Sequence, residues 1–188
     1  MKKSIIASVV ALGMVSGLAQ AAAVNEVQFK GNVTAVTCDL TPSVDGSMNP
    51  NGPGVIQLGD VKLSGVGKIV NFAFKPTNTQ ENQTACDNIA NGTQYTNVSL
   101  QWSGSKFGSS GLAAADDSAA TGSHVEIKPV NSTAGASASF VKADGEKNTF
   151  PVTLLKSGND GLKYEAVLKA GATAGEFHTS ATFNMDYK

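Results

Sequence analysis

Two Ser-x-x-Lys spacings are the first candidates for chemistry, because a serine held beside a lysine base can act as a nucleophile in acyl transfer. They occur at Ser103–Lys106 and at Ser139–Lys142. That chemistry relies on a helix to set the two side chains together, whereas the flanking residues at both places indicate strand or loop. We therefore interpret both spacings as coincidental in a serine-rich chain.

Histidines and acidic residues provide few alternatives. His124 and Glu126 would share one face of a strand and could hold a metal ion, but no third ligand is evident. The pair Asp116 and Asp117 lacks the further oxygen ligands and the glycine of a calcium loop. His178 falls among polar residues, where a solvated side chain is expected. The sequence predicts no catalytic site, no metal and no cofactor, so we do not expect an enzyme.

The N-terminus predicts export. A basic start at residues 1–3, an apolar run over 5–18 and small residues at 19–23 form a secretory signal peptide, cleaved after Ala21 or Ala23. The apolar run is too short and too broken by glycine for a membrane anchor. We therefore expect residues 1–23 to be removed and the mature chain to be secreted without membrane insertion.

Charge argues against nucleic acid as a partner. Without Lys2 and Lys3 the 14 basic residues fall to 12 against 15 acidic ones, a net charge of −3. The sequence contains no arginine, although bidentate arginine contacts dominate the recognition of phosphate and guanine. The lysines are scattered and form no basic patch.

Cys38 and Cys86 are the two cysteines of the chain. A redox pair or a metal site is the functional alternative, and a single disulfide is the structural one. The lack of a Cys-x-x-Cys spacing and of a nearby histidine favours the disulfide in an exported protein. A bridge closing about 49 residues would stabilise the fold by about 4 kcal/mol.

The last fourteen residues, opened by Gly175, show the strongest pattern in the chain. Polar residues alternate there with a mostly apolar set, which predicts a half-buried strand. The apolar set is Phe177, Thr179, Ala181, Phe183, Met185 and Tyr187. Such a strand needs neighbours on both edges, since otherwise backbone groups and an apolar face stay open.

A second alternating stretch near the N-terminus could supply one of these neighbours. Its inward set would be Asn25, Val27, Phe29, Gly31 and Val33. Our interpretation is that the two ends of the chain pair with each other, but in different molecules.

Between these ends the sequence predicts short strands separated by turn signals. The strands are expected at 55–58, 61–63, 69–74, 95–102, 125–130, 150–155 and 162–168, with 157–161 as a hairpin-like turn. Loops are expected at 41–54, 77–84, 103–123 and 131–139, with one possible helical turn over 113–120. This succession indicates an antiparallel β-sandwich in a single domain.

Several features together resemble the pilin subunits of chaperone–usher fimbriae, the family of type 1 and P fimbrial subunits. The resemblance covers the whole mature chain. It rests on residues 29–33 before the first cysteine, the Cys38 and Cys86 pair, residues 55–59, a glycine fourteenth from the C-terminus and the penultimate Tyr187.

The resemblance implies an all-β fold, an incomplete immunoglobulin-like sandwich of six strands that a donor strand from a neighbouring subunit completes. Residues 24–34 would be the donor extension and 35–188 the pilin domain. Gly175 and the apolar set of the last strand would form the acceptor groove and the chaperone-binding strand. The implied partners are copies of itself or related subunits, a periplasmic chaperone and an outer-membrane usher. The implied location is the cell surface, in fimbriae.

Three alternatives remain open at this point. Residues 27–33 could form the first strand of their own sandwich. The chain could be a single-domain adhesin or a minor adaptor that binds a host glycan or protein, with Trp102 and Tyr95 as a ligand platform, although Trp102 also suits the core. A secreted enzyme on a sandwich would need paired catalytic groups that the sequence does not show.

Overall fold

The computed structural model describes residues 38–44, 47–48 and 54–188. All of them belong to the unit Ala35–Lys188 into which the chain divides. The predicted signal peptide at 1–23 and the predicted donor extension at 24–34 lie outside the described residues.

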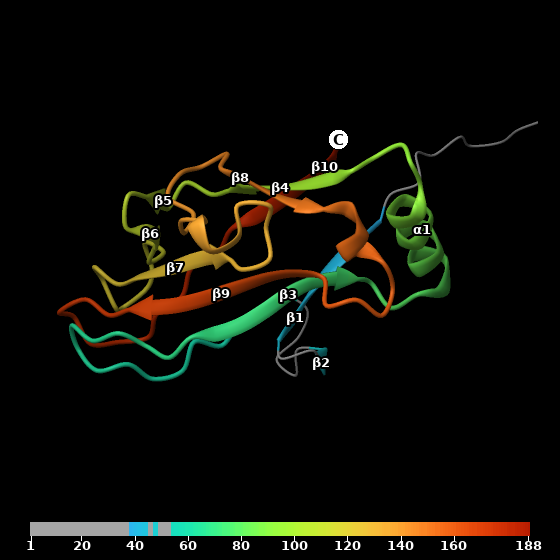
Figure 1. Ribbon diagram of the computed structural model, residues 1–188. Coiled ribbons are helices and arrows are strands. Elements are labelled where there is room, and N and C mark those ends of the chain that lie inside the picture. Colours follow the sequence, from blue (N-terminus) through green and yellow to red (C-terminus); the bar gives the residue numbers. More distant parts are fainter. Residues whose placement is uncertain (1–37, 45–46, 49–53) are drawn as a thin grey trace, which may run out of the picture. The chain divides into compact units, whose positions relative to one another are not determined.

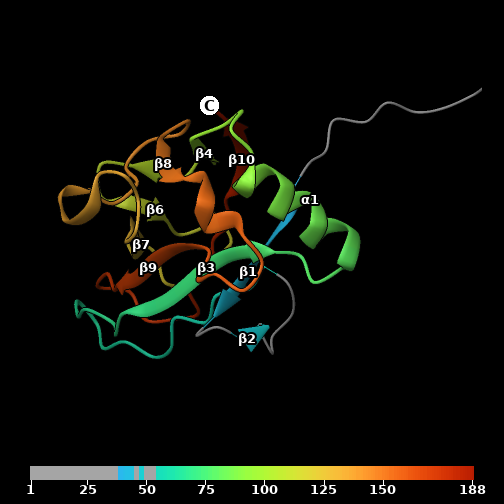
Figure 2. The ribbon, with the colours of Figure 1, turned by 45° about the vertical axis from the view of Figure 1, so that its right-hand side comes forward.

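Two antiparallel sheets face each other and form a sandwich (Figures 1 and 2). In the described part of the chain the larger sheet has seven strands, in the order β2 (Ser47–Met48), β1 (Leu40–Val44), β3 (Val70–Pro76), β9 (Leu162–Lys169), β7 (His124–Pro129), β6 (Gly111–Ala113) and β5 (Phe107–Gly108). The smaller sheet has three, in the order β10 (Thr182–Tyr187), β4 (Asn97–Ser103) and β8 (Lys147–Pro151). The predicted antiparallel sandwich is confirmed.

The core lies between the sheets and is centred on Tyr164. Strand β9 buries alternate residues, so Leu162, Tyr164, Ala166 and Leu168 face inward as the two-residue period requires. The Tyr164 ring lies 5.5 Å from those of Trp102 and Phe150. Its hydroxyl donates a 3.1 Å hydrogen bond to the Asn148 side chain, which satisfies a polar group where burial raises the pKa of the phenol.

A helix replaces the loop expected at 77–84, and that prediction was wrong. Helix α1 (Gln80–Asn91) starts after Thr79, whose hydroxyl accepts a 3.3 Å hydrogen bond from the Asn82 N–H as an N-cap. It buries Cys86, Ile89 and Ala90 and exposes polar residues elsewhere. Because α1 contains so few apolar residues, its sequence shows no apolar repeat by which a helix could have been predicted. The helix lies at the end of the sandwich opposite the β5–β6 hairpin (Figure 1).

The loop expected at 41–54 begins as strand instead. Pro42 lies in β1 opposite Phe74 of β3, and β2 pairs only with Ser43 and Val44. Proline has no N–H to donate, and at Pro42 neither neighbouring strand requires one, as is usual for a proline near a sheet edge.

Other expectations also require correction. Residues 113–120 form the end of β6 and then turns rather than a helical turn, and the loop at 103–123 contains the β5–β6 hairpin with Leu112 buried. Residues 150–155 start in β8 but continue as a 3-10 turn, η2 (Val152–Leu155); another, η1 (Gly135–Ser137), lies in the loop at 131–139. The turn at 157–161 does not close a hairpin, because β8 and β9 belong to different sheets and the chain crosses the sandwich there.

Candidate functional site

The residues first considered for chemistry are engaged in other interactions. Lys106 forms an ion pair with Asp116, and the Lys142 ammonium lies 4.7 Å above the centre of the Phe140 ring. Glu126 forms a 3.4 Å ion pair with Lys169 on the neighbouring strand. Among the described residues no group of three or more possible metal ligands occurs.

The ligand platform suggested for Trp102 and Tyr95 is not formed. Trp102 is only 5 % exposed and packs edge-on against Phe74 and Tyr164. The Tyr95 ring lies 5.5 Å from that of Tyr187 instead. Trp102 is therefore a core residue.

The C-terminal strand β10 has one edge that is paired and one that is open. Lys188 exchanges two 2.9 Å backbone hydrogen bonds with Asn97, at the start of β4. Because hydrogen-bonded and non-bonded pairs alternate in an antiparallel ladder, Asp186, Asn184 and Thr182 also direct their backbone groups to β4. The odd-numbered residues of the strand direct theirs the other way. No other strand pairs with that edge in the described part of the chain.

Phe183, Met185 and Tyr187 of this strand belong to the apolar set that the sequence predicts, but β10 begins at Thr182, so the strand expected from Phe177 is shorter than predicted. All six members of the set, from Phe177 to Tyr187, are partly buried, and the apolar ones pack against the core. The Phe183 ring, for example, lies 4.4 Å from that of Phe74. We call the backbone groups of these residues the open edge: Phe177, Thr179, Ala181, Phe183, Met185 and Tyr187.

A groove of about 940 Å³ runs beside the upstream half of the open edge. Its floor is formed by core residues such as Phe72, Trp102 and Ile127, and its rim carries Asp60 and Glu176. Five residues predicted for an acceptor groove line it: Gly175, Phe177, Thr179, Ala181 and Phe183. The other two, Met185 and Tyr187, lie further along the chain in β10 and do not line this groove.

Residues 54–63 form the opposite wall, and strands were expected there at 55–58 and 61–63. Ile56 and Leu58 pack against the core while Val55 and Gln57 are exposed, which is a strand-like alternation. The segment is nevertheless not a strand, because the backbone groups of residues 55–60 form no backbone hydrogen bond with another described residue. In the described part of the chain, two segments whose backbones have no strand partner on the groove side thus line one groove.

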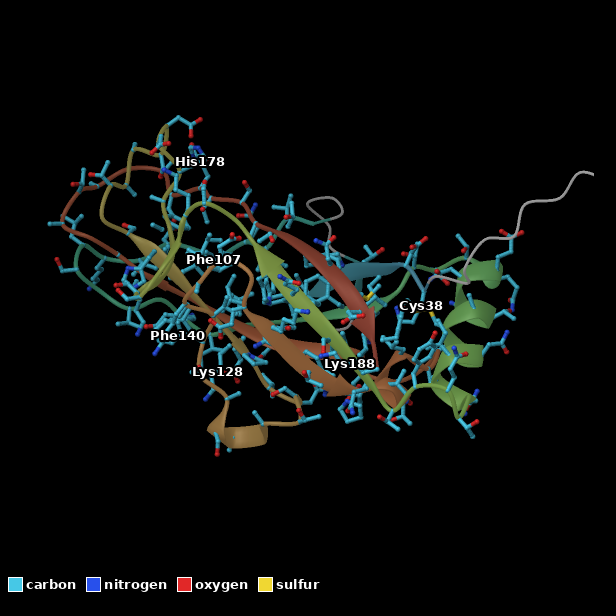
Figure 3. All side chains as sticks on the ribbon, turned by 90° about the horizontal axis from the view of Figure 1, so that it is seen from above. Cys38, Phe107, Lys128, Phe140, His178 and Lys188 are labelled. Carbon is cyan, nitrogen blue, oxygen red and sulfur yellow. A yellow bond between two sulfur atoms is a disulfide. The ribbon has the colours of Figure 1, made fainter. Side chains whose placement is uncertain are left out.

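The upstream end of the groove is closed by the loop at residues 114–123. This 114–123 loop bonds to residues 173–178 through backbone and side chains, including a 2.8 Å contact between His178 and Asp117 that lowers the Asp117 pKa. An ideal Cβ on Gly175 would lie 2.5 Å from the Ala119 Cβ, so only glycine allows this approach. His178 lies at the end of the molecule away from Cys38 and α1 (Figure 3).

The other end of the strand is anchored beside the disulfide. Cys38 and Cys86 are bonded to each other, so the predicted bridge is present and connects the residues before β1 to α1. Burial raises the pKa of the nearby Tyr187 hydroxyl. The predicted donor residues Asn25, Val27, Phe29, Gly31 and Val33 lie outside the described residues.

Sequence reasoning missed the contribution of the 114–123 loop. It is rich in alanine and polar residues without alternation, so no period marked its pairing with the C-terminal strand. It predicted a short strand at residues 55–58, but not that this segment lines the groove.

Comparison with known proteins agrees with this geometry. The chain is 35 % identical over 189 positions to the F107 fimbrial protein of Escherichia coli, covering all of both chains. It is 29 % identical over 198 positions to the K99 fimbrial protein of Escherichia coli, covering all of this chain and 99 % of that one. The crystal structure of the P pilus rod subunit PapA matches 87 % of this chain and all of its own with a TM-score of 0.50 at 22 % identity. No model of a protein family matches the sequence.

The fold defined by the sheets and the open edge is therefore that of a pilin, an incomplete immunoglobulin-like sandwich. The chain belongs to the family of fimbrial subunits of the chaperone–usher type. It is a structural protein of surface fimbriae and not an enzyme. No helix in the described part of the chain is long and apolar enough to cross a membrane.

Proposed function

We propose that this subunit polymerises by donor-strand exchange. Residues 24–34 of one copy, or of a related subunit, occupy the groove of the next and pair with its open edge. This is β-strand addition, in which backbone hydrogen bonds provide affinity and side-chain pockets provide specificity. The observation that carries the proposal is the open edge of β10 beside an apolar groove.

The donor sequence suits this groove. Val27, Phe29 and Val33 share one parity, so one face of an extended segment would direct all three into it. Each would contribute about 1.5–3 kcal/mol on full burial. Gly31 falls on the same face, and having no side chain it allows the two backbones to approach closely. A strand paired on both sides would also give residues 55–60 the backbone partner that no described residue provides.

The free subunit needs protection before assembly, because an unpaired edge beside an apolar groove favours aggregation. We propose that a periplasmic chaperone inserts one of its own strands at the open edge. An outer-membrane usher then exchanges that strand for the donor segment of the incoming subunit. The resulting fibre at the cell surface supports adhesion. The separate role of a single-domain adhesin gains no support, because Trp102 is buried in the core.

Substitution of Gly31 by leucine tests the donor role. Gly31→Leu places a bulky side chain where the backbone must approach the groove, so polymerisation should fail while binding to the chaperone continues. The measurement is electron microscopy of fimbriae together with recovery of the periplasmic chaperone complex. Gln28→Leu adds the same side chain on the opposite face of the donor and should leave fibres intact. Normal fibres from Gly31→Leu would show that the close-approach argument is wrong.

A further inference from the structure

The alternation of side chains along the open edge continues upstream of Thr182, where β4 no longer pairs with it. Strand β4 ends at Ser103, opposite Thr182, so it supports the C-terminal strand only from Thr182 onwards. A donor strand that pairs along the whole groove also needs Phe177 and Thr179 to direct their backbone groups into it. Another element must therefore hold His178 and Glu176 as β4 holds the residues after them.

The 114–123 loop does this. Its backbone supplies two bonds, from the Ala115 N–H to the His178 carbonyl at 2.9 Å and from the Ala120 N–H to the Glu176 carbonyl at 3.1 Å. Between Ala115 and Ala120 the chain turns, and the N–H groups of residues 116–119 form no backbone bond to residues 176–178, so the His178 N–H is left without a backbone partner among the described residues.

Ser118 fills this gap with its side chain. Its hydroxyl accepts a 3.3 Å hydrogen bond from the His178 N–H and donates a 2.9 Å bond to the Glu176 carbonyl. In the described chain that hydroxyl is the partner found for the His178 N–H. Ser118 is 3 % exposed, so water does not replace it easily.

We propose that Ser118 is a positioning residue for donor-strand binding. Its hydroxyl takes the place that a β4 residue would have, and it keeps the backbone of residues 176–179 oriented like that of β10. Phe177 and Thr179 then direct their backbone groups toward the donor. This inference rests on the proposed function, because it concerns how the same groove receives its donor. The loop thereby extends the usable length of the groove beyond the end of the smaller sheet.

The test measures amide hydrogen exchange, residue by residue, in the mature chain carrying a copy of residues 24–34 after Lys188. That chain fills its own groove, so assembly is not required for the measurement. Ser118→Ala should speed exchange of the Phe177 and Thr179 amides about tenfold, since the two lost hydrogen bonds held the edge that these amides share with the donor. The Met185 and Tyr187 amides, which β4 positions, should be unchanged.

Two further variants separate positioning from a general effect on the fold. Ser118→Thr keeps the hydroxyl and should restore protection, and Ser109→Ala removes an exposed hydroxyl in the nearby hairpin and should change nothing. Should Ser118→Ala not fold, Ser118→Cys provides the same comparison with a weaker donor.

The outcomes are distinct. Faster exchange at Ala115 and Ala120 with unchanged protection at Phe177 and Thr179 would reduce Ser118 to a loop-stabilising residue and overturn the proposal. Equal losses in the alanine and threonine variants would overturn it too. Free exchange of all odd-numbered amides from 177 to 187 in the unsubstituted fused chain would instead refute donor binding itself.

Discussion

Asp87 shows at the scale of one residue how α1 is held to the sandwich. Its carboxylate accepts a 2.6 Å hydrogen bond from the Ser157 N–H and a 2.7 Å bond from the Ser157 hydroxyl, across 70 positions of sequence. These bonds favour the charged form and lower the pKa of Asp87. A polar pair thus fixes a helix that buries few apolar residues.

Removing the charge of Asp87 should produce a pH-dependent loss of stability. A carboxyl whose pKa is lower in the folded state than in the unfolded state, where it is near 3.8, stabilises the fold at any pH above 3.8. This stabilisation is lost as the pH falls below 3.8 and through the pKa of the folded state. Asp87→Asn should therefore melt below the unsubstituted chain at pH 7, and the gap should close at a pH below about 3.8. Thermal unfolding at pH 7 and pH 3 tests this, with the exposed Asp60→Asn as control; a gap of equal size at both values would contradict it.

The roles of single residues could be predicted where the sequence shows an alternating pattern or two residues that can react with each other. The alternation from Phe177 to Tyr187 correctly predicted which side chains are partly buried, because a two-residue period separates the two faces of an extended segment, although only residues 182–187 form a strand. Cys38 and Cys86 were paired correctly because an exported chain with two cysteines leaves few choices. The contacts of Ser118 could not be predicted, since they join a loop to a residue 58 positions further along the chain.

The elements show where local patterns are insufficient. The N-cap Thr79 lies before α1, but the polar residues that follow lack the apolar stripe by which a helix is recognised. Conversely, residues 55–58 have the alternation of a strand, yet residues 55–60 form no backbone hydrogen bond with another described residue. A pattern of apolar residues predicts the faces of a strand but not whether its backbone is paired.

The disulfide should be the main covalent support of α1. It spans 48 positions, so replacing Cys38 and Cys86 together by alanine should lower the free energy of unfolding by about 4 kcal/mol on the loop-entropy estimate. Urea unfolding of the self-complemented chain measures this, and the unsubstituted chain under reducing conditions should match the double variant. A change below about 1 kcal/mol would show that α1 is held by other contacts.

For the whole molecule, the short strands and turn signals of the sequence predicted a sandwich. They did not predict which strands belong to which sheet. Strands β8 and β9 are neighbours in sequence, yet they belong to opposite sheets because η2 turns the chain across the core. The incompleteness of the fold was predictable only through the resemblance to pilins. In the described structure it is visible as an open edge and a groove.

The proposed polymerisation requires that a donor strand from another molecule completes the sandwich. Its most direct test is thermal unfolding of a chain lacking residues 1–33, with and without a copy of residues 24–34 fused after Lys188 through a flexible linker. The linker makes donation intramolecular, so effective concentration replaces the neighbouring subunit. If a donor strand completes the fold, the deleted chain should be unstable alone, and the fused chain should be a monomer that melts far above it. Equal melting temperatures, with the deleted chain already folded and soluble by itself, would contradict the account.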